Sequence, residues 1–261
     1  GGSHGGDTFR ELLDMWAESG YCNLRESPDD YVWVEEPGNI LLFDYPRIDD
    51  RPIPEFKTGL FGNTVPNNPQ CKPWIFWGRK PREIEVQRQQ CLSYDERSTL
   101  SIFLGKIENN IQYNNRTTYD WSSQIEKFTM PISNGPAPYP YTQIEYLNEI
   151  KNSKFGLTLP GYGPKCNREI EYLAMGTVPI FIDGCDTTYH NPLIENVHYI
   201  KVSEPDEIPE KINDIDKNQW KLLSINGTNW YNANCSRFGS FAITKRIIDR
   251  IISEREMNAV V

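Results

Sequence analysis

The fold is decided by the stretch KFGLTLPGYGPKCNREIEYLAMGTVPIFID, residues 154–183. An apolar run opens it, a loop with two glycines follows at 160–166, and the amphipathic segment NREIEYLAMG leads into a second apolar run, VPIFI. Short apolar runs bounded by turn residues are typical of buried strands, and a glycine commonly ends a helix. Strand, loop, helix and strand in this order predict a right-handed crossover between parallel strands.

The same alternation continues around this stretch. LSIFLG at 100–105 and HYIKV at 198–202 are predicted strands, and IEYLNEIKNS at 144–153 has the spacing of an amphipathic helix. Further helices are expected at 121–128 and 241–257. This half of the chain therefore predicts a parallel sheet with helices on its faces.

The N-terminal part has the pattern of a smaller unit of the same class. A helical pattern at 8–19 precedes strand-like runs at 31–34, 40–43 and 74–77, with a proline-rich loop at 46–73. We therefore predict an α/β protein with two Rossmann-like units facing a cleft, the N-terminal one abbreviated. The expected boundaries are 7–97 for the first unit, 98–240 for the second, and 241–261 for a C-terminal helix that can pack back on the first.

Composition excludes some classes of partner. The chain has 261 residues and a formal net charge of −9, whereas a protein that neutralises nucleic-acid phosphates needs clustered lysine and arginine. No apolar run is long enough to cross a bilayer. The first six residues, GGSHGG, have the look of an expression tag and are left out of the fold prediction. We expect a soluble protein that does not bind nucleic acid and has no membrane-spanning segment.

The loop at 160–166 and the helix after it carry the candidate chemistry. Gly161 and Gly163 allow the backbone to approach a ligand closely, and the start of a helix favours an anion such as a diphosphate. Lys165 and Arg168 add positive charge, and Glu171 lies one turn further, where a carboxylate can accept hydrogen bonds from ribose hydroxyls. The alternative is an ordinary crossover whose helix start is solvated.

This segment resembles the donor-binding block of exostosin-type glycosyltransferases. NSKF at 152–155 is followed by Arg168, Glu171, Gly176 and Pro179 at the spacing of that family. LSIFLG followed by Lys106 looks like the first strand of the same domain, so the resemblance covers about residues 99–202. Within this family, the sequence resembles the members encoded by large chlorella viruses, which include an enzyme that adds xylose to capsid glycans.

The resemblance implies a GT-B architecture and an inverting transfer from a nucleoside-diphosphate sugar, best UDP-xylose, to a glycan acceptor such as an N-glycan. It implies no required cofactor and no essential divalent cation, and a location in the host cytosol for a viral member or the Golgi lumen for a cellular one. Many GT-B enzymes carry a second glutamate where this chain has Gly-Pro-Lys at 163–165, which leaves the donor sugar open. The implied donor-binding residues are Lys106, Gly161, Tyr162, Gly163, Lys165, Asn167, Arg168 and Glu171.

An inverting transfer needs a carboxylate that takes the proton of the acceptor hydroxyl. Asp44 directly follows the run ILLF, and Asp49 and Asp50 lie in the same loop, so these three are the candidate bases, with Asp44 preferred because a strand anchors it. Turn formation or a surface ion pair is the alternative for each. Asp214 and Asp216 match the metal-binding pattern D-x-D, but helix capping is the favoured interpretation, and no metal site is predicted.

Two other functions stay open. A different Rossmann-type sugar-nucleotide enzyme is disfavoured because no G-x-G-x-x-G follows a first strand. A non-catalytic carbohydrate-binding or capsid-associated protein is favoured by aromatic residues expected at the surface. Those residues are Trp74, Trp77, Tyr139 and Tyr141.

Overall fold

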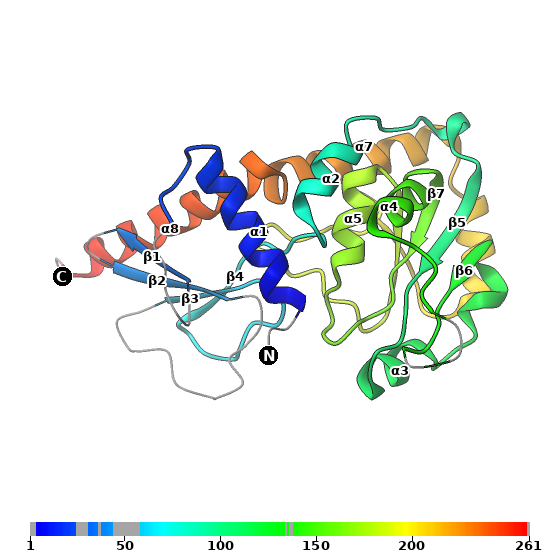
Figure 1. The fold of residues 1–261 in the computed structure, drawn as a ribbon, viewed down its shortest axis with the longest axis horizontal. Coiled ribbons are helices and arrows are strands. Elements are labelled where there is room, and N and C mark those ends of the chain that lie inside the picture. The colour runs from blue at the N-terminus through cyan, green and yellow to red at the C-terminus, as the bar shows by residue number, and fades with distance from the viewer. Residues whose placement is uncertain are drawn as a thin grey trace.

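The computed structural model describes residues 4–24, 31–35, 38–43, 58–133, 135 and 138–259. Two units lie side by side, each built on its own sheet (Figure 1). Neighbouring strands run parallel throughout the second sheet and in most of the first. The predicted α/β class is therefore confirmed.

The first unit contains a four-stranded sheet in the order β1-β2-β3-β4, in which only β1 and β2 are antiparallel. The strands are β1 (Tyr31–Glu35), β2 (Gly38–Phe43), β3 (Thr58–Phe61) and β4 (Cys71–Pro73). Helices α1 (His4–Glu18) and α8 (Arg237–Ala259) share a core with it. Two indole N–H groups join α8 to this core, from Trp16 to Ser240 Oγ at 2.9 Å and from Trp74 to Thr244 Oγ1 at 2.8 Å.

The second unit contains a five-stranded parallel sheet in the order β6-β5-β7-β8-β9. Its strands are β5 (Thr99–Leu104), β6 (Lys127–Thr129), β7 (Ser153–Leu157), β8 (Val178–Ile182) and β9 (Ile200–Val202). Its helices are α3 (Asn110–Arg116), α4 (Gln143–Lys151), α5 (Asn167–Met175), α6 (Ile208–Asn213) and α7 (Lys217–Asn234), and α2 (Pro81–Gln87) joins the two units. Every residue of β8 is buried, because apolar cores cover both faces of the sheet.

Two local predictions were wrong. The run at 74–77 is buried without belonging to either sheet, and the segment at 121–128 is a short 3-10 helix (Trp121–Gln124) followed by β6 rather than one helix. The proline-rich stretch, expected to be mostly loop, also contains the short strands β3 and β4, and α3 and α6 were not predicted. An apolar run signals burial, but it does not separate a strand from a buried loop.

Candidate functional site

The carboxyl edge of the second sheet is the natural place for a ligand. β5 lies between β6 and β7, so the chain leaves β5 towards one side and β7 towards the other. Open parallel sheets bind ligands where such neighbouring connections diverge. Here that point is flanked by Gly105 and Lys106 after β5 and by the loop at 158–166 after β7.

Arg168, on the first turn of α5, reaches this edge. Its guanidinium lies 4.4 Å from the ring centre of Phe103, and Nη2 donates to the carbonyl of Leu104 at 3.3 Å. A side chain at Gly105 would come within 2.9 Å of Nη2, so the glycine makes room for the cation. Nε and Nη1 are buried and meet no hydrogen-bond acceptor in the described part of the chain. Buried donors without partners are costly, and an anionic ligand would satisfy them.

Tyr139 and Lys106 border the same edge. The Tyr139 hydroxyl donates to the carbonyl of Leu104 at 3.4 Å, and burial raises the pKa of this phenol to about 12. Lys106 is half-buried and forms an ion pair with Glu108 at 2.5 Å. Both line a cavity of about 220 Å³. Its other lining residues are Pro131, Ile132, Ser133, Gly135 and Pro138.

Arg116 fixes the two loops of this edge, a role that no sequence pattern indicated. Nε donates to the Pro160 carbonyl at 2.9 Å and Nη1 to the Lys106 carbonyl at 2.5 Å. The side chain is buried, and burial, together with the nearby charge of Arg168, lowers the pKa of Arg116 to about 10. An arginine that ends a short polar helix carries no signal by which its contacts could be predicted.

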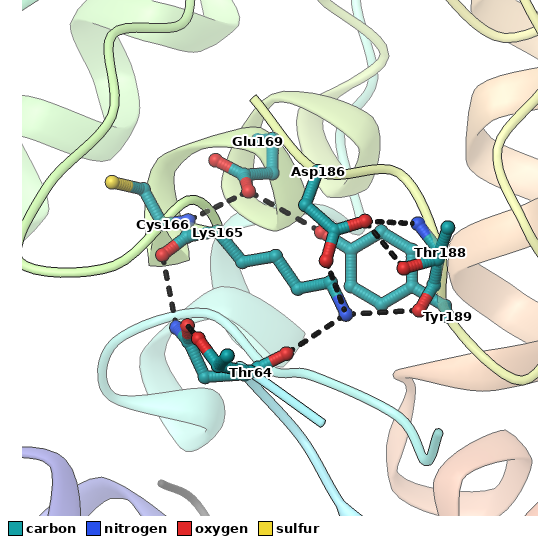
Figure 2. Close-up of polar contacts among 8 residues, drawn as sticks. Thr64, Lys165, Cys166, Glu169, Asp186, Thr188 and Tyr189 are labelled. Atoms are coloured by element: carbon teal, nitrogen blue, oxygen red, sulfur yellow. Dashed lines mark hydrogen bonds and ion pairs between the residues drawn. The ribbon is translucent and has the colours of Figure 1, made fainter. Parts of the chain in front are cut away.

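Lys165 does not lie at this edge. Figure 2 shows its ammonium among carbonyl and carboxylate oxygens: Nζ donates to Asn63 O at 3.0 Å and to Thr188 O at 2.9 Å, and lies 3.5 Å from Asp186 Oδ2. Asn63 returns a bond from Nδ2 to the Lys165 carbonyl at 3.0 Å. Because Asn63 belongs to the loop after β3, Lys165 joins the two units. The sequence predicted that Lys165 contacts a diphosphate, but its ammonium has no free N–H that faces solvent.

The rest of the loop also meets the first unit. A side chain at Gly163 would lie 2.4 Å from Asn63 Oδ1, and Gly161 packs against the Cys166 thiol. Asn167 Nδ2 donates to the Trp77 carbonyl at 2.7 Å. Among these residues Tyr162 is exposed. The two glycines therefore allow close approach of protein groups, where the sequence predicted close approach of a ligand.

The two glutamates of α5 are buried. Glu169 accepts a hydrogen bond from the Cys166 amide at 2.6 Å, and burial raises the pKa of its carboxyl to about 7. Glu171 accepts from Tyr146 Oη at 2.7 Å and from the Arg79 amide at 2.8 Å. Both carboxylate oxygens of Glu171 are therefore engaged by protein groups, because α4 and the linker before α2 cover this side of α5. Burial raises the pKa of Glu171 as well.

The remaining candidates fall into three groups. Asp44, Asp49 and Asp50 lie outside the residues that the structure describes. Asp216 is the N-cap of α7 and accepts from the Asn218 and Gln219 amides, so the predicted helix cap is confirmed. Trp74 and Trp77 are buried in the first core, and the expectation of exposed tryptophans was wrong. Within the described ranges, no group of three or more acidic, histidine or cysteine side chains could hold a metal ion.

No model of a known protein family matches the chain, and no curated protein matches it. In the described part of the chain, no helix combines the length and apolar character needed to span a membrane.

Proposed function

We propose that the protein is a glycosyltransferase of GT-B type that uses a nucleoside-diphosphate sugar. The observation that carries the proposal is Arg168, which places two buried nitrogens without a partner among the described residues at the carboxyl edge of a parallel sheet. In this proposal Arg168 binds the donor diphosphate and stabilises the charge that develops as the diphosphate leaves. Lys106 supplies a second cation at the rim of the adjoining cavity.

The resemblance to exostosin-type enzymes adds the finer assignment. The donor is UDP-xylose, the acceptor is a glycan hydroxyl, and the configuration at the anomeric carbon inverts. The general base comes from the segment that follows β2 in the sequence, with Asp44 preferred over Asp49 and Asp50. Glu171 and Lys165 take positioning roles, because their polar atoms are engaged by Tyr146 and Asn63.

One further cation, Arg116, stabilises the site rather than the substrate. Arg116 has Nε and Nη1 on the carbonyls of the two edge loops, so it keeps the loops in place. The leaving diphosphate is then neutralised by side chains alone, and the transfer needs no essential divalent cation.

Calorimetry with UDP, GDP and dTDP tests the proposal. Arg168→Gln should weaken UDP binding roughly tenfold or more, because one charge-assisted hydrogen bond contributes about 1.5–3 kcal/mol. Arg250→Gln is the matched control, since Arg250 is an exposed arginine on α8 that pairs with Glu254. A chain that binds free sugar but none of the three nucleotides would be a carbohydrate-binding protein, and the proposal would fail.

A further inference from the structure

A second cavity lies far from the sheet edge, at the junction of the two units. It has a volume of about 340 Å³ and is formed by the end of α1, by α2, and by the elbow between α7 and α8. In Figure 1, α2 lies beside this elbow, and the Tyr231 hydroxyl donates to Glu85 Oε1 at 3.0 Å across it. We call it the junction cavity. Its lining residues are Tyr21, Glu85, Val86, Arg88, Gln89, Ser236, Arg237 and Phe238.

The junction cavity is positively charged in an acidic protein. Arg88 and Arg237 are its cations, and Glu85 is its one anion among the lining residues. Glu85 is already engaged by the Tyr231 hydroxyl and, at 3.5 Å, by Arg88 Nη1. Within the residues that the structure describes, Arg88 Nε is buried and meets no acceptor, while Arg88 Nη2 donates to Asn232 Oδ1. The Arg237 carbonyl accepts a hydrogen bond from Ser240 Oγ, and its guanidinium interacts with the Glu18 carboxylate only through charge. Both arginines therefore have donor capacity left for an anion.

The same cavity exposes an apolar surface. The Phe238 side chain is 64% exposed and Val86 60%, which leaves large apolar faces in water. The rings of Phe238 and Tyr21 lie 5.8 Å apart in an edge-to-face arrangement. A planar group could pack against this pair, because aromatic rings favour offset and edge contacts at such distances.

We propose that the junction cavity binds a small organic anion with a planar apolar body. Arg88 and Arg237 take the anionic group, while Phe238, Tyr21 and Val86 contact the ring. A hollow of this size is within the range of small-molecule sites, which combine an apolar lining with a few polar groups. The site is independent of the donor site proposed above.

A fluorescence titration with 8-anilinonaphthalene-1-sulfonate, an aromatic anion, tests this proposal on the full chain. The double variant Arg237→Gln/Phe238→Ser should lose at least roughly tenfold in affinity, the equivalent of one charge-assisted bond. The matched control is Arg250→Gln/Met257→Ser on the same helix. Arg250 is an exposed arginine, and Met257 is 64% exposed, as Phe238 is. The control should bind like wild type.

Two further ligands test whether the site requires a negative charge and whether it is separate from the donor site. The uncharged analogue N-phenyl-1-naphthylamine should bind more weakly than the sulfonate and should not respond to Arg237→Gln alone. Saturating UDP should leave the sulfonate bound. The proposal is overturned if the double variant and its control bind the sulfonate equally, if the neutral analogue binds as tightly as the anion, or if UDP displaces the probe.

Discussion

Replacing Lys165 by methionine tests whether this lysine joins the two units or binds the donor. Methionine preserves most of the aliphatic volume but removes the ammonium that donates to Asn63 O and Thr188 O. The Asn63 carbonyl is buried, and the loss of its donor costs about 1–3 kcal/mol. Thr188 is exposed and Asp186 is 27% exposed, so water can replace the ammonium at both and each adds less. The free energy of unfolding should fall by about 2 kcal/mol.

Urea unfolding followed by tryptophan fluorescence measures this loss, and Lys201→Met is the matched control. Lys201 pairs with Asp183 at 2.7 Å in the same unit, but the two side chains are 43% and 64% exposed. Its removal should leave the stability close to that of wild type. The reasoning is refuted if both variants unfold at the same urea concentration. If Lys165→Met has normal stability but has lost its affinity for UDP, Lys165 is a donor-binding residue and does not join the two units.

Three further predictions concern stability. The carboxyl of Glu169 has its pKa raised from 4.5 to about 7, so the folded state binds more protons than the unfolded state in that window. As pH rises from 4.5 to 7, the unfolding free energy of the wild type should therefore fall relative to that of Glu169→Gln. Above pH 7 the difference between the two proteins should stay constant. Thermal melts at a series of pH values measure it. Arg97→Lys should lower the free energy of unfolding by about 2–4 kcal/mol, as chemical unfolding would measure. The buried guanidinium donates to the carbonyls of Leu92, Ser153 and Met175, and one ammonium cannot reach all three. Gly239→Ala should lower the melting temperature by several degrees, because its Cβ would lie 1.9 Å from the Asn232 carbonyl oxygen, and unchanged melting in calorimetry would contradict the close α7–α8 elbow.

The second sheet was predictable because its signals are local. The runs at β5, β7 and β8 are largely apolar and buried, and Gly176 ends α5 as predicted, in the left-handed conformation. β3 and β4 have four and three residues, too few for an alternating pattern, and prolines surround them. Short strands of this kind are fixed by their neighbours in the sheet rather than by their own sequence.

The site was predictable only in part, for the same reason. Arg168 was identified as a cation at a helix start, and it does reach the sheet edge. Lys165 has the same local signal, yet its partner Asn63 lies 102 positions earlier. Burial of Glu171 likewise depends on Tyr146 and on the linker at Arg79. Local patterns locate charged residues, but tertiary contacts decide whether their donors are left for a ligand.

The return of α8 to the first unit has a consequence for biosynthesis. Ile243, Ile247, Ile248 and Ile251 complete a core whose other members, such as Leu12 and Ile40, leave the ribosome about 200 residues earlier. The second unit has all its strands translated by Val202 and can fold on the nascent chain first. We therefore expect the apolar faces of the first unit to stay exposed until α8 has been translated, which makes this unit the part of the protein that depends most on chaperones.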